Sequence, residues 1–422
     1  MSEPPVALGI DVGTSGVRVA ALDAAGDMVA GEAQPFAPEA DRAAPDIWWQ
    51  ATATCLDRLR SAISFEAITG LAVDGTSGTM LGLDADGAPV GRAIMYNVPC
   101  PDAAIVAAID TAAPSDSPAR GANSALARAI ALMRRPGVVR VLHQADWIAA
   151  RIAGFTGVSD TNNALKTGYD PVAETWPDWI EAAGMPVAAL PPVVAPGTPV
   201  RRLGRAASER FGLPPDAFLH AGTTDGCASF LATGASAPGD AVTALGSTLV
   251  LKLFCDRPIS APQYGIYSHR LGDLWLVGGA SNSGGAVLRH FFADADLARL
   301  TAQLAPDRPT GLDYYPLLTP GERFPVNDPA FAPRLTPRPQ DDTIFLQGLL
   351  EGIARIETMG YRKLDALGAP PLRSVRSVGG GAVNMAWTQI RRAMLGVPFL
   401  PARASDAAAG TARLALGRNA LP

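Results

Sequence analysis

Cysteine and histidine are scarce in this chain, which has four of each among its 422 residues. The cysteines, at positions 55, 100, 227 and 255, show no paired spacing. This pattern is typical of a reducing compartment and does not favour a disulfide framework. The four histidines are scattered without metal-ligand spacing. We expect them to be structural or surface residues.

Positive charge in excess and long apolar runs are also missing. A formal net charge of −5 argues against a nucleic-acid partner, which would need a basic field. No apolar run approaches the ~18 residues of a membrane span. The start, Met1–Pro5, lacks the basic segment and apolar core of a signal peptide. The sequence therefore predicts a cytoplasmic protein with no membrane partner.

Three catalytic signatures are absent as well. The chain has no P-loop lysine motif, no Gly-x-Ser-x-Gly elbow and no Gly-x-Gly-x-x-Gly spacing. These absences exclude a P-loop enzyme and argue against a serine hydrolase and a dinucleotide-binding fold.

The length and composition indicate a globular protein of two domains. A chain of 422 residues, with 48% hydrophobic and 18% charged residues, is too long for one core. The turn at Pro238-Gly239-Asp240 is a natural boundary. We therefore predict domains at 1–238 and 239–422.

One stretch near the middle places a carboxylate at the end of a strand. Residues 217–221 form an apolar run, and Gly222-Thr223-Thr224 then leads to Asp225, before a helix expected from Cys227. Strand ends facing helix starts are where α/β proteins position catalytic groups. The alternative is that Asp225 only caps the following helix.

The amino-terminal segment 6–23 is predicted to form two strands joined by a glycine-rich hairpin, with a third strand at 28–30. Gly13 and Gly16 allow backbone amides to approach an anion, and Thr14 and Ser15 add hydroxyl donors. Asp11 ends the first strand. A carboxylate beside a phosphate cradle favours a divalent cation between them.

A second polar loop, Asp74–Thr79, follows a buried strand at 68–73, which a crossover helix at 47–63 precedes. Its short hydroxyls and bare backbone, at Gly75 and Thr76 among others, suit a hydroxylated ligand. Further elements are expected at strand 80–83, strand 92–96, helical segments within 101–140, a helix from 144, a polar loop at 159–163 and a helix at 176–183.

The second half repeats the opening pattern. Residues 241–253 are again strand, Gly246-Ser247-Thr248 turn and strand. A strand at 274–277 leads to a glycine-rich loop at 278–285 and a helix at 286–292, a junction that suits phosphate or ribose. Later, a helix at 344–364, a strand at 375–378, the glycines 379–381 and helices at 387–395 and 406–416 complete the chain. The paired hairpins suggest two related halves.

Together these loops resemble those of the actin, hexokinase and heat-shock-chaperone ATPases, and specifically the FGGY carbohydrate kinases. Within that family the sequence is similar to the D-ribulose kinases of cyanobacteria and plants. The resemblance covers essentially the whole chain and depends on residues 9–16, 74–79, 221–225, 245–248, 278–282, 311–316, 321–325 and 379–382.

The resemblance implies an α/β fold of two ribonuclease-H-like domains, each with a five-stranded mixed sheet, and an interdomain catalytic cleft. It implies ATP and Mg²⁺, and a small sugar as the substrate. Asp225 would be the general base, and Asp11 would hold the metal. The implied sugar contacts are Asp11, Ser15, Gly75, Thr76 and Asp225. The implied ATP contacts are Thr14, Ser15, Gly246, Ser247, Thr248, Gly284, Gly380, Gly381 and Asn384.

Three functions remain open at this point. The first is an ATP-dependent kinase that converts D-ribulose to D-ribulose 5-phosphate, and the second is a xylulokinase or another sugar or polyol kinase of the family. The third is a nucleotide-gated clamp like actin or the chaperone ATPases. Asp225 and the sugar-sized loop at 74–79 favour a kinase. The protein is expected to be a monomer or a homodimer.

Overall fold

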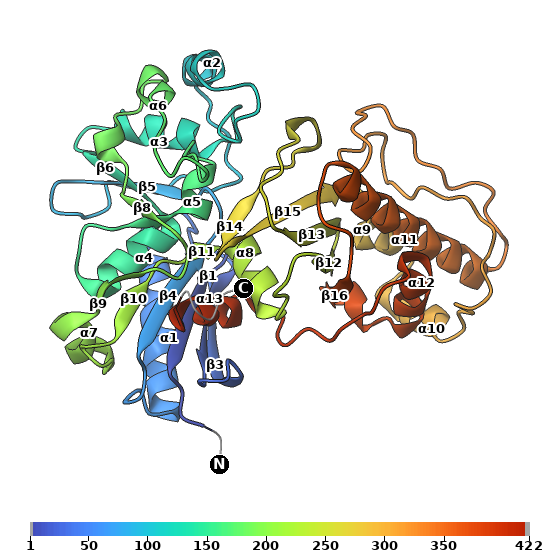
Figure 1. Cartoon of the computed structure of the whole chain (residues 1–422), viewed down its shortest axis with the longest axis horizontal. Helices are drawn as coiled ribbons and strands as arrows, with labels where there is room; N and C mark the ends of the chain where they lie inside the picture. The colour runs from blue at the N-terminus through green and yellow to red at the C-terminus, as the bar shows by residue number, and fades with distance from the viewer. Residues whose placement is uncertain (1–2, 418–422) are drawn as a thin grey trace. The chain divides into compact units, whose positions relative to one another are not determined.

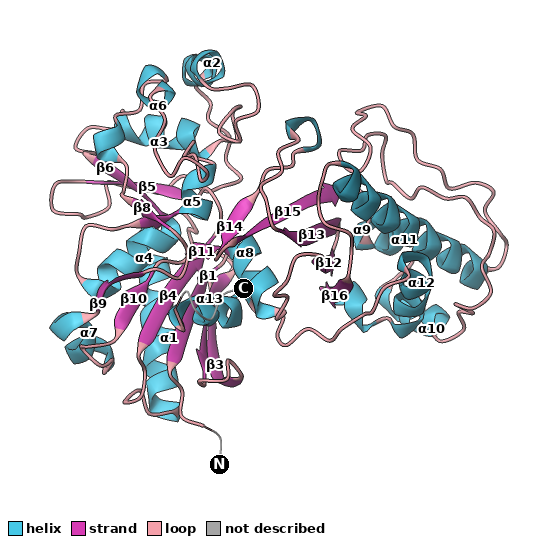
Figure 2. Cartoon of the chain, in the orientation of Figure 1, coloured by secondary structure: helices cyan, strands magenta, loops and turns pink. Residues whose placement is uncertain are grey.

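The computed structural model describes residues 3–417, and its helices and strands are shown in Figures 1 and 2. Within that range the chain divides into two compact units. The first contains residues 3–234, 269–273 and 406–417, and the second contains residues 235–268 and 274–405. This division differs from the predicted boundary at 238/239, because two later segments belong to the first unit.

The first unit is built on a seven-stranded mixed sheet in the order β3-β2-β1-β4-β10-β9, with β11 also paired to β4. Strands β1, β4 and β10 are parallel, and β2, β3 and β9 are antiparallel to their neighbours. This sheet therefore has more strands than the five that were predicted, and the additional strands include the short β11. The strands are β1 (Ala7–Val12), β2 (Gly16–Leu22), β3 (Met28–Pro35), β4 (Gly70–Gly75), β9 (Pro199–Arg202), β10 (Phe218–His220) and β11 (Thr223–Thr224).

Side-chain alternation along β1 gives the sheet two different faces. The large residues Leu8, Ile10 and Val12 join the main core. That core also holds residues of α1 (Pro45–Ala62), α4 (Gln144–Ala153) and α7 (Gly204–Phe211). The opposite face carries small residues and Asp11.

The small residues let helix α13 (Ala407–Ala415) lie directly on β1 and β4. A Cβ atom on Gly9 would come within 2.1 Å of the Ala408 carbonyl oxygen, so only glycine permits this approach. On its other side α13 packs against α8 (Asp225–Ala232). The carboxyl-terminal helix therefore completes the first unit.

A smaller cluster of elements in the first unit has its own apolar core, which includes Met80, Ile109, Ile130 and Ile180. Strands β5 and β6 pair antiparallel, and β7 and β8 pair parallel. The elements of this region are β5 (Met80–Leu83), α2 (Ala103–Ala112), α3 (Ala125–Met133), β6 (Arg140–His143), β7 (Ser159–Asp160), α5 (Thr161–Leu165), α6 (Trp179–Ala182), the 3₁₀ turn Val187–Ala189 and β8 (Val193–Val194).

A short segment from the second half of the sequence also belongs to the first unit. Strand β14 (His269–Leu271) is held by Asn162. The Arg270 amide donates to Asn162 Oδ1 at 2.9 Å, and Asn162 Nδ2 donates to the Arg270 carbonyl at 2.8 Å.

The second unit contains a mixed sheet in which β15, β13, β12 and β16 are neighbours in that order. Strand β12 is antiparallel to β13 and parallel to β16. The core packs Leu249, Leu251 and Leu253 with residues of the 25-residue helix α11. The elements are β12 (Asp240–Leu245), β13 (Leu249–Cys255), β15 (Leu274–Ser281), α9 (Gly285–Phe291), α10 (Asp294–Thr301), α11 (Asp342–Ala366), β16 (Ser374–Val378), α12 (Met385–Leu395) and the 3₁₀ turns Pro262–Tyr264 and Gly380–Val383.

A buried ion pair holds α11 to α12. Arg391 Nε donates to Glu357 Oε2 at 2.6 Å, and Thr243 of β12 donates to Glu357 Oε1 at 2.5 Å. The guanidinium and the carboxylate are both buried, so each needs the other to offset its lost hydration.

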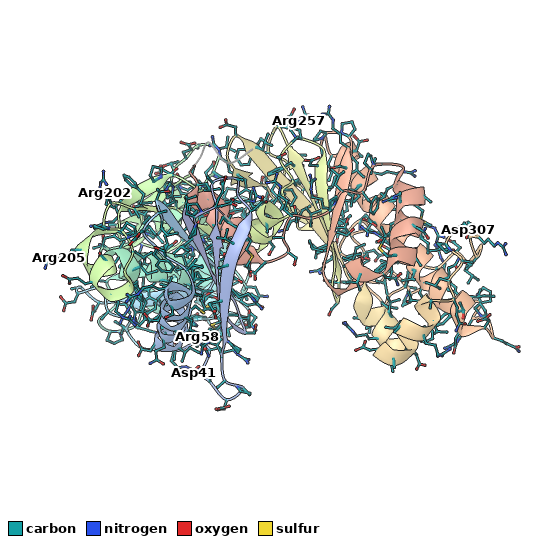
Figure 3. The ribbon with its side chains drawn as sticks, turned by 90° about the horizontal axis from the view of Figure 1, so that it is seen from below. Asp41, Arg58, Arg202, Arg205, Arg257 and Asp307 are labelled. Carbon is teal, nitrogen blue, oxygen red and sulfur yellow. The ribbon has the colours of Figure 1, made fainter. Side chains whose placement is uncertain are left out.

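Exposed charges form ion pairs at the surface. Arg202 pairs with Asp216, and Arg205 pairs with Glu209. Figure 3 shows Arg202 and Arg205 at the periphery of the ribbon. Solvent-exposed pairs of this kind contribute at most about 1 kcal/mol each. Among residues 3–417, no helix is both long and apolar enough to cross a membrane.

Two predicted elements are wrong, and a third is shorter than predicted. Residues 92–96 form no strand, since Ile94 makes only an isolated bridge to Met80. Residues 159–163 are not an open loop: they are buried as β7 and the start of α5, whose cap is Asp160. The helix predicted at 176–183 covers only Trp179–Ala182.

Candidate active site

Strand register brings two carboxylates together in the first unit. Strands β1 and β4 are parallel, and their paired residues include Asp11 and Asp74. Thr223 of β11 pairs with Asp74 from the other side of β4, and Asp225 follows two residues later as the first residue of α8. Three acidic side chains therefore gather at the carboxyl ends of neighbouring strands, where α/β folds place their ligands.

These carboxylates influence one another strongly. Burial, followed by the negative charge of Asp225, raises the pKa of Asp11 to about 6. Arg18 acts against this rise, since its Nη1 lies 3.3 Å from Asp11 Oδ2. Burial and the charge of Asp11 also raise the pKa of Asp74 well above its ordinary value, although the hydroxyl of Thr411 from α13 donates to Asp74. Perturbed groups of this kind concentrate at functional sites.

Asp225 does not occupy the capping position of its helix. The cap of α8 is Thr224, and Asp225 is the first helical residue. Its Oδ1 accepts a 2.6 Å hydrogen bond from the Gly226 amide, and the residue is partly exposed. A carboxylate in a first helical turn is favoured by the helix dipole, and partial exposure leaves it open to a ligand.

The hairpin between β1 and β2 presents its polar residues to solvent. Thr14 and Ser15 are exposed, and the turn is closed by a 3.0 Å hydrogen bond from the Gly13 amide to the Gly16 carbonyl. This arrangement leaves the two hydroxyl groups available next to Asp11.

The loop after β4 is buried, in contrast to the hairpin. Gly75 ends the strand, and Thr76 is 3% exposed. Gln144, the first residue of α4, accepts hydrogen bonds from the Thr76 amide at 3.1 Å and from the Thr76 hydroxyl at 2.8 Å. The two predicted sugar-contact residues of this loop therefore lie beside a side chain that the sequence did not single out.

A cavity of about 610 Å³ lies within the second unit. Its lining includes five of the predicted nucleotide residues, which come from the β12–β13 turn and the segment between β16 and α12: Gly246, Ser247, Gly380, Gly381 and Asn384. Thr248 and Gly284 are not among the lining residues, whereas Gly285 is. The volume is in the range of small-molecule sites.

Gly284 adjoins residues that line this cavity. Its φ is +146°, and a Cβ atom there would lie 2.7 Å from the Ser247 carbonyl oxygen. The next two residues continue the contact, since the Gly285 amide donates to Gly246 at 2.9 Å and the Ala286 amide donates to Ser247 at 3.0 Å. Glycine at 284 therefore lets the β12–β13 turn lie against the start of α9.

The other residues that line the cavity were not predicted from the sequence. Helices α9 and α10 contribute Leu288, Arg289, Leu297 and Thr301 among others. Asn384 connects the start of α12 with α10. Its Oδ1 caps α12 by accepting from the Trp387 amide, and its Nδ2 donates to Thr301 Oγ1 at 3.3 Å. The leucines at 297, 300 and 304 have helical spacing, which was the available signal for α10.

Comparison with known proteins decides the family. Residues 6–108 match the FGGY family of carbohydrate kinases, N-terminal domain, and residues 244–417 match its C-terminal domain. The chain belongs to the FGGY family of carbohydrate kinases. It is therefore a sugar kinase, which transfers a phosphoryl group from ATP.

Relatives and solved structures agree with the family and the fold. The xylulose kinase of Escherichia coli is 24% identical over 91% of this chain and 83% of its own length. A "xyloylose kinase" from Brucella ovis has a TM-score of 0.84 at 24% identity, covering 97% of this chain and 90% of that one. A ligand-bound xylulose kinase from Lactobacillus acidophilus has a TM-score of 0.81 at 18% identity, covering 98% and 89%. The predicted α/β fold of actin and hexokinase type is confirmed.

The first unit of this FGGY kinase offers carboxylate oxygens, the kind of ligand that Mg²⁺ prefers. Residues 3–417 contain no cluster of three or more His, Cys, Asp or Glu side chains arranged to hold a metal. Mg²⁺ in phosphoryl-transfer enzymes commonly uses only one or two carboxylates, with water and substrate phosphates as its other ligands. Asp11 is suited to that role, since the negative charge of Asp225 beside it favours a nearby cation.

Proposed function

We propose that this FGGY kinase is an ATP-dependent pentulose kinase that converts D-ribulose to D-ribulose 5-phosphate. The observation that carries the proposal is the position of Asp225, partly exposed at a strand end beside the buried Asp11. In the reaction, a sugar hydroxyl oxygen attacks the γ-phosphorus of ATP, and the bond to the β-phosphate oxygen breaks. Asp225 accepts the hydroxyl proton, and ADP leaves.

The residues of the first unit have distinct roles in this proposal. Asp225 is the general base, which contributes ~10²–10⁴-fold to the rate of a proton transfer. Thr14 and Ser15 contact the transferred phosphoryl group through the exposed hairpin. Asp11, Ser15, Gly75 and Thr76 complete the sugar site. Alignment of the two substrates supplies much of the remaining acceleration.

The second unit supplies the nucleotide contacts. The turn residues Gly246, Ser247 and Thr248 bind the β- and γ-phosphates through backbone amides and hydroxyls. Gly284, Gly380, Gly381 and Asn384 lie along the adenosine, whose base occupies the 610 Å³ cavity. The sugar and the first phosphate residues thus belong to the amino-terminal half, 1–238, and the adenosine site belongs to the remainder, 239–422.

Asp11 would hold the magnesium ion that accompanies ATP, and a cation held there would supply positive charge next to the phosphates. Arg18, which pairs with Asp11 at 3.3 Å, competes for the same carboxylate oxygen. Because Arg18 is 46% exposed, the guanidinium can turn to solvent when the cation binds.

D-Xylulose is the second candidate substrate. The observation that favours it is that the named relatives are xylulose kinases, although at 24% identity. D-Ribulose and D-xylulose differ only in the direction of one hydroxyl group. A site discriminates more weakly between such epimers than against a sugar that lacks the hydroxyl altogether.

The experiment is a coupled ADP-release assay over D-ribulose, D-xylulose, other pentuloses and glycerol, each with and without Mg²⁺. We expect the highest kcat/KM with D-ribulose and no turnover without Mg²⁺. A higher kcat/KM for D-xylulose would reject the choice of sugar and retain the pentulose kinase. A higher value for glycerol or another polyol would reject the pentulose kinase.

A further inference from the structure

The hydrogen bonds around Thr76 fix the direction of two hydroxyl protons in the loop after β4, those of Thr76 and Thr79. The Tyr96 amide donates to Thr79 Oγ1 at 3.1 Å, and the two threonine hydroxyls are 2.6 Å apart. Since the Thr76 hydroxyl donates to Gln144 Oε1, the Thr79 hydroxyl must donate to Thr76 Oγ1. The Thr76 hydroxyl proton is therefore already used within the protein.

The same bonds determine the orientation of the Gln144 amide group. Its oxygen must face Thr76, because a backbone N–H can only donate. The nitrogen Nε2 consequently points elsewhere, and it has no hydrogen-bond partner although Gln144 is 0% exposed. A buried donor without an acceptor is costly, so native proteins rarely leave one unpaired.

Other unpaired atoms lie in the same hydrogen-bonded region. They are Asp74 Oδ1, the hydroxyl oxygens of Ser77 and Thr161 and the amide oxygen of Asn163. Ser77 adjoins Thr76, and Asn163 Nδ2 donates to the carbonyl of Thr223, the β11 residue paired with β4. Apart from the Asp74 carboxyl, whose pKa burial raises well above its ordinary value, these groups are neutral, and they comprise both donors and acceptors. The ligand that would satisfy them is a neutral polyhydroxylated molecule.

We propose that Gln144 is a specificity-determining residue of the sugar site, an inference that rests on the proposed pentulose kinase function. Its Oε1 fixes the amide and hydroxyl of Thr76, and its Nε2 donates to one hydroxyl of the bound pentulose. Because Nε2 has no acceptor within the described protein, its partner in the complex is a hydroxyl group of the sugar. The donor on this side of the sugar is thus Gln144, and Thr76 can only accept from the ligand through its hydroxyl.

The test compares Gln144→Met with Gln347→Met, a matched control in the other unit. Gln347 is likewise a buried helical glutamine, and its Nε2 donates to Ala305 at 3.0 Å, outside the lining of the nucleotide cavity. We expect Gln144→Met to lower kcat/KM for the preferred pentulose by about 10- to 100-fold, mainly through KM, since it removes hydrogen bonds to substrate. The KM for ATP should stay unchanged, and Gln347→Met should retain the wild-type sugar KM.

Deoxy analogues of the preferred pentulose identify the contacted hydroxyl. The wild-type enzyme should discriminate against the analogue that lacks the partner of Nε2, and Gln144→Met should lose that discrimination while keeping the others. A second variant, Gln144→Glu, retains the oxygen that faces Thr76 and loses the amide donor. Assayed at alkaline pH, where the new carboxyl carries no proton to donate, it should fail to restore the sugar KM.

The outcomes separate the two hypotheses. If the wild-type chain phosphorylates no sugar in the panel, the proposed function fails. If it does phosphorylate a pentulose, a sugar KM in folded Gln144→Met equal to that of Gln347→Met overturns the role of Gln144 alone. Full rescue by Gln144→Glu would also overturn it, because only the contact with Thr76 would then matter.

Discussion

Asp11 is held in an environment that opposes its own charge. It is 4% exposed, it pairs across the sheet with Asp74, and Asp225 lies close enough to raise its pKa. Isolated from ligands, such an arrangement destabilises the folded chain. It is consistent with a group whose charge is balanced by a bound cation, since functional sites often retain strain that a stability-optimised site would lose.

Asp11→Asn should therefore lower activity and raise stability. The folded-state pKa, about 6, lies above the ordinary value of 3.8, so the stability from the protonated form is complete below ~4 and is lost as the pH rises through about 6. Asparagine carries no charge at any pH, so the variant does not lose this stability as the pH rises. At pH ~8 the variant should gain on the order of 2–3 kcal/mol, with little difference at pH ~4.

Thermal melting of both proteins across this pH range measures the effect, with turnover recorded at several Mg²⁺ concentrations. The variant should need more Mg²⁺ and turn over more slowly. Parallel melting curves, with the same pH dependence in both proteins, would contradict the electrostatic account of Asp11.

At the scale of elements, strands followed by polar loops were the most predictable features. Segments 6–23, 241–253 and 375–378 carry strong apolar runs and sharp glycine turns, and the structure places strands there. The strand predicted at 92–96 failed because its pairing is tertiary and consists of one bridge, at Ile94. Local pattern cannot reveal whether a partner strand exists.

The candidate site follows the same rule: its loops could be predicted from local sequence, and the contacts between them could not. Asp11, Asp74 and Asp225 stand at visible strand ends, as do the hairpin residues. The pairing of Asp11 with Asp74, and the positions of Gln144 and Thr411 beside this loop, arise only from strand register and helix packing. Thr411 lies 337 residues from Asp74, and nothing local in the sequence relates them. Sequence patterns find the loops, and tertiary packing decides which side chains meet in them.

Helix α13 provides a test at this scale, because its packing depends on Gly410. A Cβ atom there would lie 1.8 Å from the Ala228 carbonyl oxygen of α8, and backbone cannot move aside easily. Gly410→Val should displace α13 and lower the free energy of unfolding by at least about 3 kcal/mol, in the range of severe overpacking. Because α13 carries Thr411, the sugar site should be affected as well.

Chemical denaturation of wild type and Gly410→Val checks this prediction. Limited proteolysis should cut the variant near residue 406, where α13 begins in the sequence. An unchanged denaturation midpoint, with α13 still protected from cleavage, would show that the helix does not pack as described.

In the whole molecule, the two compact units carry different parts of the proposed site. The first carries the three carboxylates and the sugar loop, and the second carries the nucleotide cavity. Family membership makes the chain a sugar kinase. The central claim that goes beyond membership is that Asp225 takes the proton of the attacking hydroxyl.

The most direct measurement of that claim is the turnover of Asp225→Asn, followed as sugar phosphate formed by ³¹P NMR at saturating pentulose and MgATP. The variant keeps the size of the side chain and removes the base. The account predicts a fall in kcat of ~10²–10⁴-fold, with the wild-type melting temperature nearly retained. A folded Asp225→Asn enzyme with near-normal kcat would contradict it.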